Sequence, residues 1–239
     1  MDTTYQDLAN NIVALWKAKS EASRSHPNIT RGNERIIIGL AGPPGSGKST
    51  LAYKVAKIVQ SFPAGPRVSI VSLDGFHLTR AELSALPNAS EAFARRGAPW
   101  TFNAAAATRL VQQLKSTFGN QDLLVPTFDH AVKDPVPGGL VVDKDTEVCI
   151  VEGNYVLSNE GAWASIAELL DERWLLDVDP AVARSRVAAR HLSSGIEPTM
   201  ELALARTDYN DMPNGRLVME SSKNRYDRLI PSIEDAAQR

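Results

Sequence analysis

A glycine-rich stretch directly after a short apolar run is the feature that most constrains how this chain folds. The run covers residues 36–38, and the stretch that follows reads GLAGPPGSGKST over 39–50. Consecutive β-branched apolar residues predict a buried strand, and the sequence from Lys48 onward predicts a helix. Glycines between a strand and a helix let successive backbone N–H groups turn inward, where the helix N-terminus adds its positive dipole end. The stretch therefore predicts an anion-binding loop in an α/β fold.

This stretch fits every position of the G-x-x-x-x-G-K-[ST] template, the P-loop. In that template backbone amides and the lysine hold the β and γ phosphates of a nucleoside triphosphate, while the next hydroxyl ligates Mg²⁺. We expect Lys48 to contact the phosphates, Ser49 to hold the metal ion, and ATP with Mg²⁺ to be the cofactors. The predicted nucleotide-binding residues are Gly42, Pro43, Pro44, Gly45, Ser46, Gly47, Lys48, Ser49 and Thr50.

Short apolar runs alternate with helical segments along the rest of the chain. The expected strands cover residues 35–41, 68–73, 123–125, 147–151 and 174–178. One expected helix begins at Lys48, and another covers residues 103–116. Such alternation predicts a P-loop NTPase fold: a five-stranded, mostly parallel sheet with helices on both faces.

The first 34 residues precede the predicted domain, which covers residues 35–239. Leu8, Ile12, Leu15 and Trp16 recur at helical spacing, which predicts an amphipathic helix, followed by a polar connection. We expect the apolar face of this helix to cover the sheet or to pair with a second copy, so a homodimer stays open.

Composition excludes several classes of protein. The 26 Lys and Arg residues against 28 Asp and Glu leave a formal net charge of −2, which offers no overall basic field to nucleic acid or anionic lipid. No window approaches the roughly 18 apolar residues of a membrane span. The lone Cys149 cannot form an intramolecular disulfide, as is typical of a reducing compartment. We expect a cytoplasmic protein with a small-molecule partner, no nucleic acid and no membrane.

Two acids follow predicted strands: Asp74 comes after 68–73 and Glu152 after 147–151. In a doubly wound sheet the ligand crevice lies at the carboxyl ends of the strands. There, one acid can orient an attacking hydroxyl and the other can hold Mg²⁺ or its waters. The alternative is that each acid only caps its own loop. We interpret Asp74 as catalytic and Glu152 as a metal ligand.

A predicted helix after Pro180 carries three arginines. Arg186 and Arg190 are four residues apart and share a face, whereas Arg184 points about 160° away from Arg186. An arginine pair on a lid helix would stabilise the charge that phosphoryl transfer spreads over the γ oxygens. We predict a catalytic role for Arg186 and Arg190, with a solvated helix face as the alternative.

Two long segments, 76–102 and 126–143, resist the alternation and start at strand ends, where insertions commonly carry function. The second contains the turn-forming sequence DPVPGG at 134–139. We expect both segments to be substrate-binding insertions rather than parts of the sheet.

Together, these residues resemble the P-loop kinases that group uridine kinase, bacterial-type pantothenate kinase and phosphoribulokinase, over roughly residues 36–226, and most of all the uridine-kinase-like branch. The resemblance implies that Asp74, within LDGFH at 73–77, accepts the proton of the substrate hydroxyl. Glu152 with Gly153 is similar to the family's strand-ending Glu-Gly, and Arg186 with Arg190 match its arginine lid.

The resemblance also implies an acceptor pocket. The segment 97–103 resembles the family's Pro-x-x-Phe-Asp, with Asn103 in place of the acid, and 126–130 resembles Pro-x-Tyr-Asp, with Phe128 in place of the tyrosine. These two replacements leave the acceptor open. The expected substrate-binding residues are Asp74, His77, Phe102, Asn103, Phe128, Asp129 and Glu152.

Two further features concern the ligands. In similar kinases the region around 208–215 approaches the adenine, and here turn-type residues interrupt helical sequence, with Asn210 and Asn214 as candidate readers. Arg95 and Arg96 either hold a carboxylate or phosphate of the acceptor or are surface charges.

Three functions remain after this reading. The leading one is an ATP-dependent kinase that acts on a hydroxyl of a small metabolite: a nucleoside such as uridine, a pantothenate-like compound or a sugar. The second is a nucleotide-dependent switch, although the chain has no Asn-Lys-x-Asp guanine-reading motif. The third is a regulatory ATP-binding protein without catalysis.

Overall fold

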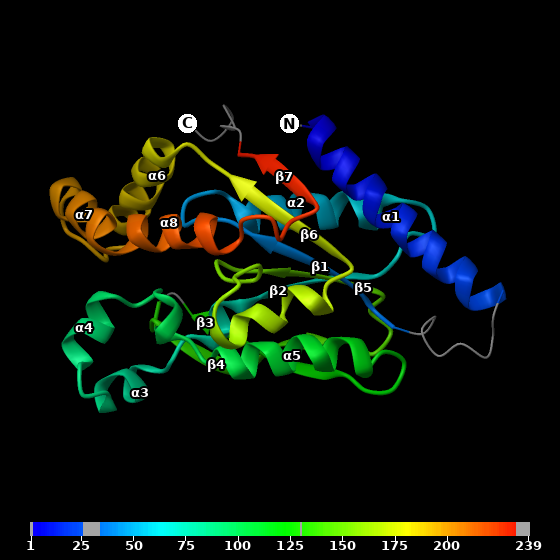
Figure 1. The fold of residues 1–239 in the computed structure, drawn as a ribbon, viewed down its shortest axis with the longest axis horizontal. Helices are drawn as coiled ribbons and strands as arrows, with labels where there is room; N and C mark the ends of the chain where they lie inside the picture. The colour runs from blue at the N-terminus through cyan, green and yellow to red at the C-terminus, as the bar shows by residue number, and fades with distance from the viewer. Residues whose placement is uncertain (1, 26–33, 130, 233–239) are drawn as a thin grey trace.

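The computed structural model describes residues 2–25, 34–129 and 131–232. Its main sheet has five strands in the order β2-β5-β1-β6-β7, and every neighbouring pair is parallel (Figure 1). The strands are β1 Ile36–Ala41, β2 Val68–Ser72, β5 Val148–Glu152, β6 Glu172–Asp177 and β7 Arg228–Pro231. β1 and β5 are buried along their whole length, which explains their almost continuous apolar sequence.

Helices cover both faces of this sheet. α1 and α2 pack with Ile36 and Ile38 in one apolar cluster, and α5 packs with Ile37 in a second cluster on the opposite face. The helices are α1 Asp2–Ser25, α2 Lys48–Ser61, α3 Arg80–Ala85, α4 Ala89–Ala94, α5 Ala104–Ser116, α6 Pro180–Ser193, α7 Met200–Arg206 and α8 Met212–Ser221. The expected P-loop NTPase fold is therefore confirmed.

The predicted membership of the sheet was wrong for one strand. Residues 123–125 do not join the main sheet, and its fifth strand is β7, next to β6 at the edge. β7 buries only Ile230 of its four residues, so it lacks the apolar run that marks a central strand.

Most of the segment 126–143 belongs to a β-hairpin that lies outside the main sheet. β3 Leu123–Asp129 pairs antiparallel with β4 Asp134–Val142, so the expected turn at 134–139 lies inside a strand. Proline is tolerated here because both strands of a two-stranded sheet are edge strands. Gly139 allows the close pairing, since a Cβ on it would lie 2.0 Å from Thr127 Oγ1.

The expected turn around 208–215 is helical. A π-helical turn over Thr207–Asp211 runs directly into α8. Pro213 follows this turn as the second residue of α8, and it cannot donate the backbone hydrogen bond of a continuous α-helix. Asn210 and Asn214 are buried and hydrogen-bond within the protein, so residues typical of turns serve here as internal polar contacts.

The amphipathic helix at the N-terminus is confirmed as α1. Its Leu8 and Ile12 are buried in the cluster that contains α2, and Asn11 accepts a hydrogen bond from Arg228 on β7 at 2.7 Å. The homodimer stays a prediction. None of the helices described is both long and apolar enough to span a membrane.

Candidate active site

A single cavity of about 990 Å³ opens at the carboxyl ends of the main-sheet strands. Its wall combines the loop after β1, the ends of β2 and β5, the helix α6 and parts of the two long segments. Among the predicted site residues, the wall includes Lys48, Asp74, Glu152, Arg186 and Arg190. Segments that are far apart in sequence therefore meet where the fold class predicts a ligand crevice.

The P-loop takes the curled conformation that its glycines permit. Gly45 and Gly47 have φ of +77° and +93°, in the left-handed region that favours glycine, and Gly47 caps α2. A Cβ on Gly45 would lie 2.7 Å from the carbonyl oxygen of Ala183, so α6 rests on the loop. Of the nine predicted nucleotide-binding residues, 44–50 line the cavity. Gly42 and Pro43 do not line it, but their carbonyl oxygens accept hydrogen bonds from Lys48.

Lys48 is held by three oxygen atoms. Its Nζ donates to the carbonyl oxygens of Gly42 at 2.8 Å and Pro43 at 3.1 Å, and to Asn154 Oδ1 at 2.9 Å. Asn154 was not among the predicted site residues, although it is a polar residue two positions beyond a strand-ending acid. These contacts place the ammonium group at the cavity wall, where a phosphate group can exchange for one of them.

Burial and charge act against each other at the centre of the site. Burial lowers the pKa of Lys48, while Glu152 and then Asp74 raise it. Burial and the nearby Asp74 raise the pKa of Glu152, partly offset by Lys48, Ser72 and Ser49. A lysine and a carboxyl group whose pKa values are shifted by burial and by each other in one cleft are typical of a functional site.

Ser49 and Glu152 form the oxygen pair that a magnesium ion would need. The Ser49 hydroxyl donates to Glu152 Oε1 at 3.2 Å. The part of the chain that the structure describes has no cluster of three or more His, Cys, Asp or Glu suited to a metal ion. A small ligand set fits Mg²⁺, because this ion usually binds one or two carboxylates together with substrate phosphates and water.

Asp74 lies in a tight 3-10 turn, Leu73–Phe76, directly after β2. Its backbone N–H donates to Ser72 Oγ at 3.4 Å, and its carbonyl oxygen accepts from the backbone N–H of His77 at 3.1 Å. A Cβ on Gly75 would lie 2.0 Å from the carbonyl oxygen of Pro126, so only glycine lets this turn pack against β3.

The arginines of α6 divide as their spacing predicts. Arg186 donates to the carbonyl oxygen of Gly45 at 3.2 Å and to Ser232 Oγ at 3.0 Å, and Arg190 also lines the cavity. Arg184 points elsewhere and pairs with Asp208 at 2.6 Å. Ser232, which the sequence reasoning missed, donates in turn to the carbonyl oxygen of Ser46 at 2.7 Å.

The candidate acceptor residues fall into two groups. His77, Phe102 and Phe128 line the cavity, and the His77 ring contacts both phenylalanines, with its centroid 3.9 Å from that of Phe102 and 4.9 Å from that of Phe128. Asn103 and Asp129 are not part of the cavity wall: Asn103 caps α5 through Ala106 N, and Asp129 accepts from the backbone N–H groups of residues 131 and 132. A role for either in acceptor binding stays a prediction.

Arg95, Asn210 and Asn214 form an internal polar network. Arg95 donates to Asn214 Oδ1 at 3.2 Å, Asn214 donates to Asn210 Oδ1 at 3.2 Å, and Asn210 donates to the carbonyl oxygen of Arg96 at 2.9 Å. The network ties the segment after α4 to the π-helical turn. Of Arg95, Asn210 and Asn214, only Asn210 lines the cavity, and adenine recognition by the two asparagines stays a prediction.

A P-loop that opens into one cavity with two strand-end acids and an arginine-bearing helix defines the class of P-loop kinases. The chain belongs to the Phosphoribulokinase / Uridine kinase family, whose model matches residues 37–194. The predicted resemblance to this family is confirmed.

Individual relatives agree with this assignment. The chain is 41% identical over 212 residues to a Schizosaccharomyces pombe protein named "Putative uridine kinase C227.14", covering 89% of this chain and 84% of that protein. It is 30% identical over 237 residues to ATP-dependent kinase YFH7 of Kluyveromyces lactis, covering 84% of this chain and 66% of that protein. The crystal structure of YFH7 from Saccharomyces cerevisiae shares the fold, with a TM-score of 0.79, 22% identity, and coverage of 97% of this chain and 99% of that chain.

Proposed function

We propose that this protein is an ATP- and Mg²⁺-dependent kinase that transfers the γ-phosphate to a hydroxyl group of a small metabolite. The observation that carries the proposal is that Lys48 of the P-loop, the acids Asp74 and Glu152, and Arg190 line one cavity. Switches and motors also use a triphosphate cage, but an additional acid beside an acceptor-sized space supports group transfer.

Each residue then has a distinct role. The Asp74 carboxylate takes the proton as the acceptor O–H bond breaks, the oxygen bonds to the γ-phosphorus, and the β–γ bridging bond breaks to leave ADP. Lys48 exchanges a hydrogen bond to its own chain for one to the phosphates. Ser49 and Glu152 would hold Mg²⁺, which would neutralise charge on the phosphates.

Arg186 and Arg190 complete the charge balance from α6. Arg186 donates to the P-loop backbone at Gly45, which places it next to the phosphate site. Because Arg190 lies on the same helix, a small shift of α6 would move both arginines relative to the phosphates. Guanidinium groups in this position stabilise the charge that develops on the γ oxygens.

The cavity supports a nucleotide together with a small acceptor. Its volume of about 990 Å³ lies at the upper end of the range of small-ligand pockets. The rings of His77, Phe102 and Phe128 form one wall near Asp74. A nucleoside such as uridine, a pantothenate-like compound and a sugar are the acceptor classes to compare.

The test combines binding with product detection. Calorimetry with Mg·ATP and Mg·GTP is followed by mass spectrometry of hydroxylated metabolites incubated with Mg·ATP. With wild type we expect ATP binding and a product that has gained one phosphate, and with Lys48→Ala we expect no such product. Lys57→Ala is the control and should behave as wild type, because Lys57 is an exposed lysine of the same helix whose ammonium lies 5.5 Å from the Tyr53 ring centroid. Preferential GTP binding without product would favour a switch, and ATP binding without product would favour a regulatory protein.

A further inference from the structure

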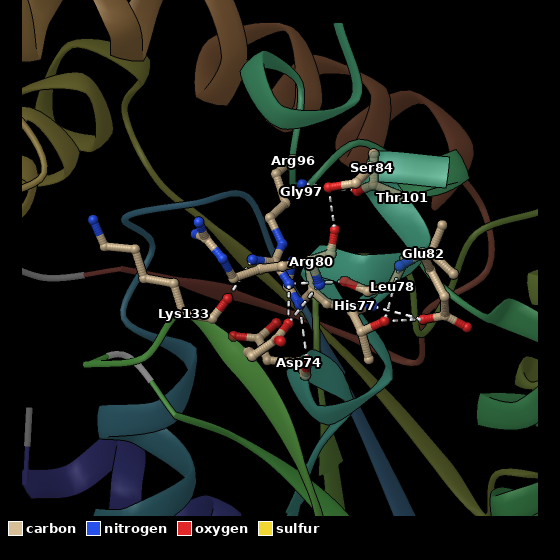
Figure 2. A network of polar contacts seen from close by, with 12 residues as sticks. Asp74, His77, Leu78, Arg80, Glu82, Ser84, Arg96, Gly97, Thr101 and Lys133 are labelled. Atoms are coloured by element: carbon tan, nitrogen blue, oxygen red, sulfur yellow. Dashed lines mark hydrogen bonds and ion pairs between the residues drawn. The ribbon is translucent and has the colours of Figure 1, made fainter. Parts of the chain in front are cut away.

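Three cationic side chains gather at the acceptor end of the cavity, beside Asp74 (Figure 2). Arg80 begins α3, Arg96 follows α4, and Lys133 directly precedes β4. All three line the same cavity as Asp74. They come from the two long segments, 76–102 and 126–143, which the sequence predicts to be substrate-binding insertions.

Arg96 is the fixed member of this group. It donates to the carbonyl oxygens of Leu78, at 2.8 Å, and of Lys133, and it pairs with Asp134 Oδ1 at 3.2 Å. Its side chain is only 12% exposed, and its guanidinium carbon lies 5.1 Å from the centre of the Phe128 ring. Arg96 therefore joins the two segments and fixes the backbone at Lys133, which has a φ of +57°.

Arg80 and Lys133 carry charges that the protein itself does not neutralise. Over residues 2–25, 34–129 and 131–232, no carboxylate forms an ion pair with either side chain. Asp134, the acid of this region, is paired with Arg96 and accepts from the backbone N–H of Arg80 at 2.8 Å. The Arg80 guanidinium instead lies over the Phe93 ring, 5.7 Å from its centre.

This arrangement leaves an excess of positive charge at the cavity wall. Burial lowers the pKa of Arg96, Asp134 raises it, and the nearby Arg80 charge lowers it further, because the two guanidinium groups repel each other. Cations along a partly enclosed wall concentrate anions there. Guanidinium and ammonium groups are the usual partners of carboxylates and phosphates.

We propose that the phosphate acceptor carries an anionic group, a carboxylate or a phosphate monoester, that binds between Arg80 and Lys133 while its hydroxyl faces Asp74. The inference rests on the proposed kinase function and narrows its substrate class. An uncharged nucleoside would bring no anionic group to either cation.

The experiment measures ATP-dependent phosphorylation of three sets of hydroxylated compounds: phosphate monoesters, carboxylates and uncharged nucleosides including uridine. We expect product from one of the two anionic sets, and the set that reacts identifies the anionic group. Arg80→Gln and Lys133→Gln should each raise the KM for that acceptor about tenfold, the effect of one lost hydrogen bond to a charged group. The KM for ATP should change little, and higher salt should raise the acceptor KM in wild type.

Matched controls are Arg109→Gln on α5 and Lys144→Gln beyond the far end of β4, both exposed and outside the cavity. Product from nucleosides alone, or an unchanged acceptor KM in both cavity variants, would overturn the anionic acceptor and leave the kinase function standing. Absence of product from all three sets would overturn both proposals.

Discussion

Glu152 and Ser72 lie opposite each other in register at the ends of β5 and β2. The Ser72 hydroxyl counteracts the rise in the pKa of the Glu152 carboxyl and accepts a hydrogen bond from the backbone N–H of Asp74 at 3.4 Å. The parallel register of β5 and β2 ends both strands at the same edge of the sheet, so the carboxylates at these ends line one cavity.

The role of Asp74 as the base can be tested by Asp74→Asn. The amide keeps the shape of the side chain but takes up a proton far less readily, so we expect kcat to fall by roughly 10²–10⁴-fold. ATP affinity, measured by calorimetry, should change little. Asp177→Asn is the matched control, because Asp177 ends β6 and is exposed outside the cavity. Undiminished turnover in Asp74→Asn would contradict the assignment.

The lid arginines can be tested within one helix. Arg190→Gln should lower kcat by about 10³-fold, in the range reported for arginines that stabilise phosphoryl transfer. Arg184→Gln removes the same charge from α6 at a position paired with Asp208, and it should leave kcat nearly unchanged. Steady-state kinetics with saturating ATP compare the two, and equal losses would show that only the overall charge of α6 matters.

Glu152→Gln should flatten the pH dependence of stability in the ligand-free protein. Burial and Asp74 raise the pKa of the folded carboxyl, so the folded state binds its proton more tightly than the unfolded state. The bound proton therefore stabilises the folded state at low pH. This stability is lost as the pH rises from about 4.3, the ordinary pKa of glutamate, through the higher pKa of Glu152 in the folded protein. Thermal unfolding between about pH 4 and 8 measures this slope.

Glu201→Gln, on the exposed side of α7, is the control for that measurement. The stability of Glu201→Gln should depend on pH as in wild type. The stability of Glu152→Gln should fall less than that of wild type as the pH rises. A Glu152→Gln profile as steep as that of wild type would show that burial of this carboxyl does not govern the pH dependence.

Gly75→Ala should destabilise the turn that carries Asp74. The added Cβ would meet the carbonyl oxygen of Pro126 at 2.0 Å, and backbone on both sides must move, at a cost of about 3 kcal/mol in unfolding free energy. Gly119→Ala is the comparison, because Gly119 has a φ of +72° but open space around it and should lose about 1 kcal/mol. Denaturant unfolding of both variants tests the difference, and equal losses would argue against the steric contact.

Ser232→Ala should weaken ATP binding. It removes the hydroxyl that accepts from Arg186 at 3.0 Å and donates to the carbonyl oxygen of Ser46 at 2.7 Å. Loss of these hydrogen bonds should weaken ATP binding by about 1 kcal/mol, which corresponds to a roughly fivefold higher KM for ATP. Ser116→Ala, whose hydroxyl bonds only within α5, should match wild type. An unchanged KM in Ser232→Ala would mean that the P-loop is positioned without this contact.

The interior of the fold could be predicted where the signal is local or strongly apolar. β1 and β5 are buried on both faces, so their sequence is apolar throughout and was recognised. Residues 123–125 look the same, yet their neighbour is β4, which joins them in a separate hairpin. β7 carries one buried residue and gave no comparable pattern. Strand pairing depends on partners distant in sequence, and no local period records them.

The sequence by itself determined the P-loop, because each conformational demand of residues 42–50 is met by the residue in place, and it identified Asp74 and Glu152 as strand-end acids. Only the tertiary structure decided that Asn154 holds Lys48 and that Ser232 joins Arg186 to the loop. It also decided that Arg80 and Lys133 share the cavity with Asp74. These contacts join residues that are far apart in sequence, and they form only when the separate segments pack together. Polar and charged side chains of this kind are common on protein surfaces, so no local sequence pattern predicts which of them will lie close together.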